Sequence, residues 1–220
     1  MINGYSIIDF ETGGLSSLKN PITELGALGI KGDTLEEVDR FDLLCKPDYN
    51  TQLVYEPKAL EVTGISLELL RREGVDIKVI VDRCIEHFEK LNVGGNFRTK
   101  PVLVGQNLKF DINFLFSIFE HCKKDLSKYV DGDKNKNGIF IPEYIDTLKL
   151  AKMAFGHTEM PNYKLGTIVE KFQLQLVEAH RSMADVVATK DILVKCIIKL
   201  RSQGNTSVEE EYRTRTHFQF

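Results

Sequence analysis

Apolar side chains recur along this chain with two different periods, one typical of strands and the other of helices. Short runs rich in Ile, Val, Leu and Phe predict strands at residues 6–11, 22–30, 37–45, 102–104 and 141–145. Spacings of three, four and seven predict helices at residues 76–91, 111–119, 147–155, 164–172 and 182–202. The stretch 57–70 predicts short helical turns around Thr63 and Gly64.

The order of these segments predicts an α/β fold. A hairpin-type turn at Lys31, Gly32 and Asp33 joins the second and third strands, so the first three strands should pair antiparallel. The later strands are separated by helices, which indicates parallel pairing. We therefore expect a mixed β-sheet, three antiparallel strands and then parallel strands, flanked by α-helices. Residues 1–202 form one domain in this interpretation. The tail at 203–220 loses periodicity and is either disordered, a strap on the domain, or a partner-binding peptide.

Two carboxylates follow one another along the first strand, at Asp9 and Glu11. Side chains alternate faces along a strand, so both point the same way while Ile8 and Phe10 point into packing. Such a pair is costly through repulsion unless a cation lies between the carboxylates. Hard oxygen ligands suit Mg²⁺ or Mn²⁺. The alternative is an ordinary exposed strand edge before a Gly-Gly turn.

Further acids occur where other predicted helices begin. Asp111 follows the strand at 102–104 and opens an apolar helix, where an acid can also act as a partner of the helix dipole. His180 and Asp185 precede or open the last long helix. Ser182 and Asp185 also fit a capping box, and His180 alone fits a surface histidine.

Together these three segments resemble the DEDDh (DnaQ-like) family of 3′–5′ exonucleases. The family's first motif, Asp-x-Glu-Thr-(Thr/Gly)-Gly, is matched by residues 9–14, and its second, His-Asn-x-x-Phe-Asp, by 107–111. Gln106 stands where the second motif usually has histidine. This position is near the substrate and is not a metal ligand, so the difference concerns how the substrate is held. The third motif, His-x-x-x-x-Asp, is matched by His180 and Asp185, whose spacing selects the histidine subclass. The resemblance covers roughly residues 4–200 and includes 62–66, 145–147 and 162–165.

The resemblance implies a ribonuclease H-like fold and hydrolysis with two divalent ions, Mg²⁺ or Mn²⁺, about 3.5–4 Å apart. Asp9 would bridge both ions, Glu11 and Asp185 would bind the ion that holds the attacking water, and Asp111 would support the second ion. His180 would be the general base, because a reference pKa of roughly 6.5 lets it accept a proton near neutrality.

The resemblance also places the terminal nucleotide of the substrate. It would lie against Thr12, Gly13 and Leu15, with Glu11 and the Thr12 backbone near its 3′-hydroxyl. Leu15 and Ile65 would contact the last base, and Asn107 would lie close by. Apolar and stacking contacts are tolerant of base identity, as an enzyme that removes any base requires. Leu15 and Ile65 also fit core positions.

The favoured function is therefore a metal-dependent 3′–5′ exonuclease that releases nucleoside 5′-monophosphates from single-stranded or frayed ends, with DNA proofreading or processing somewhat favoured. An RNA-trimming exoribonuclease remains open, since nothing identifies a contact to a 2′-hydroxyl. A non-catalytic nucleic-acid-binding module with the same fold is a further alternative, although it would not need clustered carboxylates. Recruitment to a polymerase or another replication partner through the tail would add to the favoured function.

Composition says more about where the protein is expected to reside than about the reaction it catalyses. A net charge of −3 gives no global attraction for nucleic acid, so binding must use local basic patches, of which Lys164 with Arg181 is favoured. The four cysteines are widely spaced, which suits reduced thiols better than zinc or disulfides. No segment has the pattern of a secretion signal or a membrane span, so we expect a cytoplasmic or otherwise intracellular protein without membrane partners.

One motif points to different chemistry. Residues 133–138 match the first half of an EF-hand calcium loop, but the twelfth position is Tyr144 and no strong helix precedes the segment. We interpret residues 131–138 as a polar surface turn in a hairpin insertion.

Overall fold

A five-stranded mixed sheet organises the molecule. The computed structural model describes residues 4–92, 100–155, 160–174 and 181–204. The strands are β1 (Gly4–Thr12), β2 (Ile22–Lys31), β3 (Glu37–Leu44), β4 (Val102–Gly105) and β7 (Tyr144–Asp146), in the order β3-β2-β1-β4-β7. The first three pair antiparallel, whereas β4 is parallel to β1 and to β7. The predicted mixed sheet is therefore confirmed.

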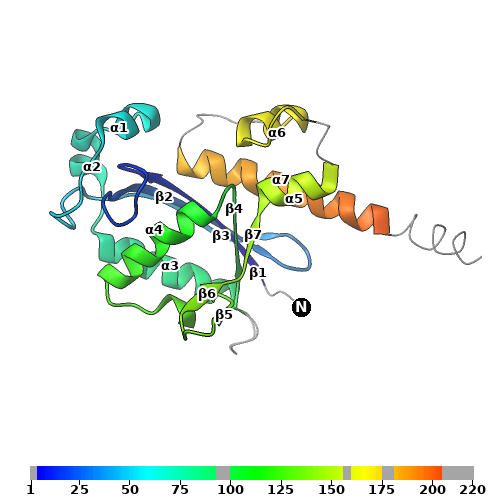
Figure 1. Ribbon diagram of the computed structural model, residues 1–220, viewed down its shortest axis with the longest axis horizontal. Coiled ribbons are helices and arrows are strands. Elements are labelled where there is room, and N and C mark those ends of the chain that lie inside the picture. Colours follow the sequence, from blue (N-terminus) through cyan, green and yellow to red (C-terminus); the bar gives the residue numbers. More distant parts are fainter. Residues whose placement is uncertain (1–3, 93–99, 156–159, 175–180, 205–220) are drawn as a thin grey trace, which may run out of the picture.

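Helices cover both faces of this sheet (Figure 1). One face carries α3 (Ile77–Leu91) and α4 (Lys109–His121), and the other carries α7 (Ser182–Gly204). Outside α7 lie α5 (Thr147–Phe155) and α6 (Leu165–Lys171), whose apolar side chains form a separate cluster with those of α7. The short helices α1 (Pro57–Thr63) and α2 (Leu67–Glu73) sit at one end. Gly64 separates them at φ 67°, a left-handed conformation that glycine adopts without strain.

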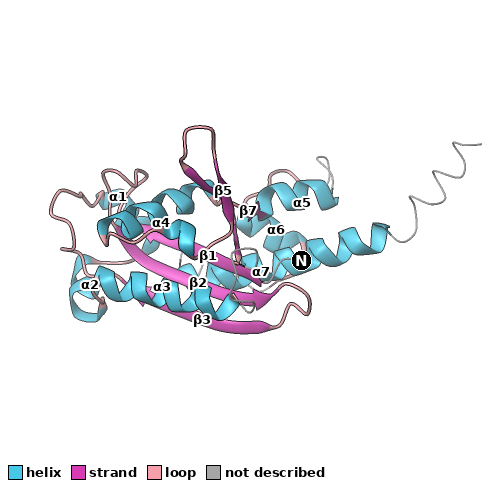
Figure 2. Ribbon diagram, turned by 90° about the horizontal axis from the view of Figure 1, so that it is seen from below, coloured by secondary structure: helices cyan, strands magenta, loops and turns pink. Residues whose placement is uncertain are grey.

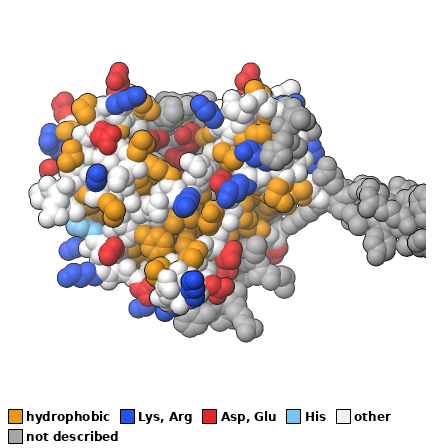
Figure 3. Space-filling model, viewed as in Figure 1, with side chains coloured by type: hydrophobic (Ala, Val, Ile, Leu, Met, Phe, Trp, Pro, Cys, Tyr) orange, Lys and Arg blue, Asp and Glu red, His pale blue; other side chains and the backbone are white. Residues whose placement is uncertain are grey.

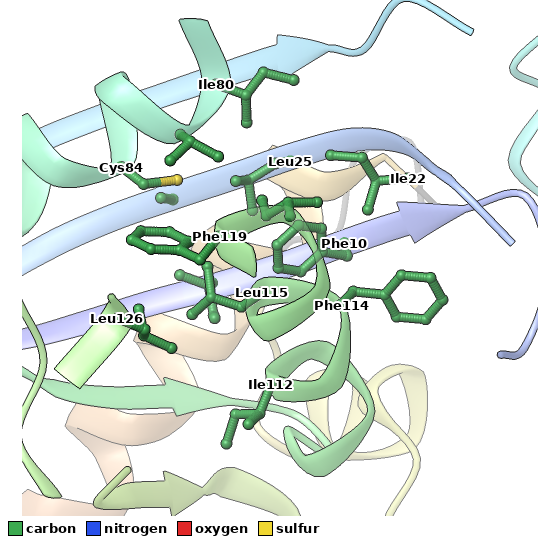
Figure 4. Packing of buried hydrophobic residues seen from close by; sticks show 14 of the residues in the cluster. Phe10, Ile22, Leu25, Ile80, Cys84, Ile112, Phe114, Leu115, Phe119 and Leu126 are labelled. Atoms are coloured by element: carbon green, nitrogen blue, oxygen red, sulfur yellow. The ribbon is translucent and has the colours of Figure 1, made fainter. Parts of the chain in front are cut away.

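The largest core lies between the sheet and the helices α3 and α4. Phe10 and Leu25 from the strands pack with Leu115 and Phe119 from α4 and with Ile80 from α3 (Figure 4). On β1 the even-numbered residues Ile8 and Phe10 face this core, which leaves the odd-numbered positions for the α7 face. That alternation directs Asp9 and Glu11 toward α7.

The segment predicted as one strand at 141–145 is two strands, which corrects that prediction. β6 (Phe140–Pro142) pairs with β5 (Gly132–Lys134) in a separate hairpin, and β7 then joins the main sheet. β6 ends at Pro142, and beyond it the Glu143 N–H donates to the Asp131 carbonyl at 2.8 Å before the chain enters β7. The hairpin projects from the body of the fold (Figure 2).

The loop of this hairpin contains the EF-hand-like residues. The Asn135 side-chain oxygen accepts hydrogen bonds from the backbone N–H groups of Asn137 (2.9 Å) and Ile139 (3.0 Å). The motif is thus used for a tight polar turn, with Gly138 at φ 76°, as the hairpin interpretation predicted.

The predicted domain boundary falls near the end of the last helix. α7 continues to Gly204, and the rest of the predicted tail, residues 205–220, lies outside the described residues. Within the described ranges no helix is both long and apolar enough to cross a membrane. All four cysteines are free thiols, and Cys45, Cys84 and Cys196 are buried.

Candidate active site

Three carboxylates from distant parts of the sequence meet at the end of β1. Asp9 and Glu11 point from β1, and Asp185 comes from the first turn of α7. One oxygen atom of each lies within 4.8 Å of the others. Acidic side chains gather in a recess on the face shown in Figure 3. β1 is a central strand and Glu11 is only 8% exposed, so the alternative of an ordinary exposed strand edge is wrong.

Asp111 lies beside this group and is held by the strand. It is buried in the first turn of α4, and its Oδ1 atom accepts a hydrogen bond from the backbone N–H of Phe10 at 3.0 Å. Its charge contributes to raising the pKa of Asp9, which places it among the electrostatic neighbours of that residue. The Asp111 side chain therefore joins α4 to β1, from a position in the first turn of α4 where an acid also suits the helix dipole.

The site is strongly biased toward binding positive charge. Burial, followed by the charges of Asp111, Asp185 and the other nearby acids, raises the pKa of Asp9 well above its usual value. Burial and the same acidic neighbours raise the pKa of Glu11 to about 8. Burial also raises the pKa of Asp111 to about 7, although the Phe10 hydrogen bond opposes the shift. In each case the raised pKa means that the negative charge is disfavoured without a compensating cation.

The donor set fits a hard divalent cation. Carboxylate oxygens are the preferred ligands of Mg²⁺ and Mn²⁺, and three of them already converge without rearrangement. The residual repulsion among them is the energetic reason that a cation would stabilise this arrangement.

The start of α7 is attached to the sheet by polar contacts. Arg181 forms an ion pair with Glu24, and the Ser182 hydroxyl donates to Asp42 at 2.9 Å. The Asp185 N–H donates to the Arg181 carbonyl at 3.2 Å. Ser182 therefore does not form the capping box that was considered from the sequence, because its hydroxyl bonds to Asp42. Arg181, predicted as a contact for nucleic acid, is instead engaged with an acid of β2.

A groove of about 340 Å³ opens beside Glu11. Its lining comes from the end of β1, the following turn, α1 and the start of α4: Phe10, Glu11, Thr12, Gly14, Leu15, Glu56, Lys58, Ala59, Val62, Thr63 and Phe110. The Leu15 side chain is 83% exposed at this groove. Thr12 donates from its hydroxyl to the Gly14 carbonyl at 2.7 Å, which holds the turn that carries Leu15.

Ile65 and Gly13, which were also predicted as substrate contacts, are not part of the groove lining. Ile65 is 1% exposed and does not line the groove, because its side chain packs in the interior after the Gly64 turn. Val62 and Thr63, just before that turn, line the groove in its place. Both residues belong to the segment 62–66 that resembles the family, but only Ile65 of that segment was predicted to contact the base. Gly13 is adjacent to the lining, where its N–H donates to the Pro21 carbonyl at 2.8 Å.

The corner between β4 and α4 holds the second motif. Asn107 is exposed there at φ 56°, and its N–H donates to the buried Asp146 carboxylate at 3.0 Å. Gln106 does not extend toward the groove. Its Nε2 donates to the Tyr163 carbonyl at 2.7 Å, and its Oε1 accepts from the Thr147 hydroxyl at 2.6 Å. The residue that replaces the usual histidine thus connects β4 to the starts of α5 and α6. His180 lies outside the described residues.

Comparison with known sequences agrees with this geometry. The sequence pattern of a family described as exonuclease (RNase T) matches residues 6–193. This chain belongs to that exonuclease family. The resemblance of the three motifs to DnaQ-like exonucleases is therefore confirmed.

The curated relatives of this exonuclease-family chain are much longer proteins. It is 29% identical over 206 residues to the PolC-type DNA polymerase III of Caldanaerobacter subterraneus subsp. tengcongensis, covering 94% of this chain and 12% of the relative. It is 30% identical over 200 residues to the Bacillus subtilis protein of the same name, covering 91% of this chain and 12% of the relative. The chain thus spans about an eighth of the length of these relatives.

Solved structures show the same fold. E. coli exonuclease I in complex with a dT13 oligonucleotide superposes with a TM-score of 0.69 at 20% identity, over 91% of this chain and 42% of that protein. At this identity the likeness demonstrates a shared fold, which agrees with the ribonuclease H-like architecture that the motifs implied.

Proposed function

We propose that this protein is a metal-dependent 3′–5′ exonuclease that releases nucleoside 5′-monophosphates from single-stranded or frayed ends. The observation that carries the proposal is the convergence of Asp9, Glu11 and Asp185 within 4.8 Å at one end of an apolar groove. A carboxylate cluster alone fits many cation sites. A cluster that borders a groove, within the exonuclease family, fits cleavage of a bound nucleic-acid strand.

The protein's part in the reaction is to hold charge and geometry. Two divalent ions, when bound, would activate a water and stabilise the leaving 3′ oxygen. Asp9, Glu11 and Asp185 would hold the ions, and Asp111, held by the Phe10 N–H, would support them. The raised pKa values of these acids show that the site disfavours negative charge unless a cation is bound.

A general base must accept the proton of the attacking water. We assign this role to His180, immediately before Arg181 and five residues before Asp185. A carboxylate committed to a metal is a poor proton acceptor, whereas an imidazole titrates near neutrality. The assignment rests on the motif.

The groove supports binding of the strand's last nucleotide. Leu15, Val62 and Phe110 offer apolar surface for a base, and such contacts accept any of the four bases. Lys58 lines the same groove and supplies positive charge for a backbone phosphate. Thr12 lies next to Glu11, where a free 3′-hydroxyl would be held. Asn107 at the β4–α4 corner completes the proposed contacts.

DNA is the favoured substrate. The relatives carry the name DNA polymerase III, and the exonuclease I structure contains a deoxyoligonucleotide. Proofreading or end-processing of DNA is therefore placed ahead of RNA trimming. We further propose that residues 203–220 contact a polymerase or another replication partner, which a pull-down with and without those residues would test.

The decisive assay compares labelled single-stranded DNA, single-stranded RNA and a mismatched duplex, each with Mg²⁺, Mn²⁺ or excess chelator. We expect stepwise release of 5′-monophosphates from the 3′ end of DNA, no reaction in chelator, and blockage by a 3′-phosphate, because its charge adds repulsion beside Glu11. Cleavage of a circular single strand would contradict the exonuclease polarity. Faster removal of RNA would favour the exoribonuclease, and binding without any cleavage would favour the non-catalytic module.

A further inference from the structure

A fifth buried acid, Glu24 on β2, lies directly beside the proposed metal ligands. It pairs with Glu11 across the β1–β2 register and is only 1% exposed. Its charge contributes to raising the pKa of both Asp9 and Glu11. An additional buried carboxylate at this position costs free energy unless it is paired, so its retention calls for a compensating partner.

That partner is the start of α7. The Glu24 Oε1 atom accepts from Arg181 Nη2 at 2.6 Å and from Arg181 Nε at 3.0 Å. The Oε2 atom accepts from the Ser182 backbone N–H at 2.9 Å. Both oxygens are thus occupied by hydrogen bonds to α7, and Glu24 is not a member of the converging carboxylate group. Its chemistry is attachment of the helix, distinct from the cation binding assigned to its neighbours.

The backbone of β2 is shaped to receive the same turn. A Cβ atom at Gly26 would lie 2.7 Å from the Ser182 carbonyl carbon, so only glycine permits this approach. Gly26 pairs with Asp9 on β1 and with Asp42 on β3. Asp42 in turn accepts from the Ser182 hydroxyl. Ser182 therefore sits over one row of the sheet, between a proposed metal ligand and an anchoring acid.

Asp185 follows this attachment within one helical turn. Any rotation or shift of the first turn of α7 would move its carboxylate relative to Asp9 and Glu11. The Arg181 guanidinium also lowers the pKa of Glu11, which partly offsets the acids around it. The contact between Glu24 and Arg181 thus affects the position of Asp185 and the electrostatic environment of Glu11.

We propose that Glu24 and Arg181 are a positioning pair, which docks the start of α7 on β2 so that Asp185 completes the cation site with Asp9 and Glu11. The proposal rests on the function proposed above, because it assigns these residues a purpose in binding the divalent ions. Neither residue is a ligand or touches the reacting atoms.

The test compares two arginines that each pair with a mostly buried carboxylate. Arg181→Met removes the proposed positioning contact, and Arg83→Met is the matched control, since Arg83 Nη2 lies 2.7 Å from Asp39 Oδ2 on the opposite side of the sheet. The rise in Tm caused by Mg²⁺, measured without substrate, reports cation binding independently of turnover. We expect the Mg²⁺ concentration for half of the full Tm rise to increase about 10- to 100-fold in Arg181→Met, the usual effect of losing a residue that orients ligands. Arg83→Met should lower the Tm and keep the wild-type Mg²⁺ response.

Two further variants guard against misinterpretation. Arg181→Lys keeps the charge with fewer hydrogen bonds, so it should fold and recover part of the Mg²⁺ response even if Arg181→Met does not fold. The double variant Glu24→Gln/Arg181→Met should lose no more Mg²⁺ response than the worse single variant, because both changes break one contact. Three outcomes would overturn the proposal. Arg181→Met and Arg181→Lys could both keep the wild-type Mg²⁺ response, or Arg83→Met could lose as much of it as Arg181→Met. The third is a double variant whose loss is the product of the two single losses. If the wild-type protein itself showed no Mg²⁺ response, the metal-dependent function would fail instead.

Discussion

The surroundings of Asp9 and of Asp39, on opposite faces of the sheet, show how a candidate active site differs from a carboxylate that only stabilises the fold. In the cluster around Asp9, burial and neighbouring acids raise the pKa of the carboxyls, and cationic help is limited. Around Asp39 on β3, burial also favours the neutral acid, but hydrogen bonds from His87, Lys90 and Arg83 outweigh it and hold the pKa well below its usual range. In the first region Arg181 offsets only part of the acidic charge, whereas in the second Arg83, Lys90 and His87 surround a single carboxylate.

The Asp39 region also includes an arrangement that is familiar from hydrolases. His87 Nδ1 lies 2.9 Å from Asp39 Oδ2, and His87 Nε2 lies 3.0 Å from the Ser6 hydroxyl. Both His87 and Ser6 are completely buried, so no substrate can reach the hydroxyl. The geometry of a serine, histidine and aspartate row therefore serves packing here. Access and unbalanced charge, more than residue identity, are the reasons for proposing the Asp9 cluster as the active site.

The largest difference between the regions should appear when each central aspartate is neutralised. Asp9→Asn should reduce nuclease activity about 10³-fold or more, because losing a bound metal ion removes several kcal/mol of transition-state stabilisation. It should also abolish the Mg²⁺-induced rise in Tm, while the metal-free protein keeps or gains stability as repulsion falls. Steady-state kinetics and thermal melting with and without Mg²⁺ measure both. Full activity in this variant would remove Asp9 from the mechanism.

The two histidines should differ almost as strongly. His180→Ala should lower turnover roughly 10²–10⁴-fold, the range for removing a general base, and should leave the Mg²⁺-induced Tm rise intact. The wild-type rate should rise with pH through a histidine-like ionisation that the variant lacks. His87→Ala should instead destabilise the protein and keep that pH profile. An unchanged pH–rate profile in His180→Ala would show that proton removal occurs without it.

Removing the charge of Asp39 should lower the stability of the protein and leave its Mg²⁺ response unchanged. Asp39→Asn should cost about 3 kcal/mol of folding free energy, because it leaves the buried His87 and the largely buried Arg83 without their charged partner. Urea denaturation gives this value, and the Mg²⁺ response of the folded protein should match the wild type. Loss of the Mg²⁺ response would mean that the two regions are coupled through the sheet.

The smallest expected effect is a dependence of stability on pH, which for Glu11 extends from about pH 4.5 to about 8 and is measured between pH 7 and 8. Folded Glu11 has a pKa of about 8, above the unfolded value of 4.5, so the folded metal-free protein keeps a proton that the unfolded chain has lost. Stability of the metal-free protein should therefore fall as pH rises, by up to about 1.4 kcal/mol per pH unit for each such group. Asp39 and His87, whose pKa values are lowered, titrate below the measured window.

Melting curves across this range, with chelator and with Mg²⁺, measure the effect. Since a bound cation replaces the protons, the Mg²⁺-induced Tm rise should grow from pH 7 to pH 8. Glu11→Gln should flatten the metal-free slope. A flat profile in the wild type would mean that these acids are already ionised in the folded protein.

Local pattern was sufficient for much of this molecule. Alternation along 6–11 and 22–30 determined the paired strands, and the helical spacing after Asp111 determined α4. The hairpin turn at residues 31–33 and the acids at the ends of strands also followed from residue chemistry within short windows, whereas the strand order came from the structure. The three motifs also identified the family, because their acidic residues occur in the family's order and spacing.

Only the tertiary structure separated residues that look alike in sequence. Asp39 lies on a strand as Asp9 does, and their opposite electrostatics depend on His87 and Arg83, more than forty residues away. The groove is lined by Val62 and not by Ile65, because the left-handed turn at Gly64 directs the later residue inward. Glu24 and Arg181 are 157 positions apart, and no local pattern relates them. Burial and charge act through space, so the balance at each carboxylate is decided by which elements pack there and not by its neighbours along the chain.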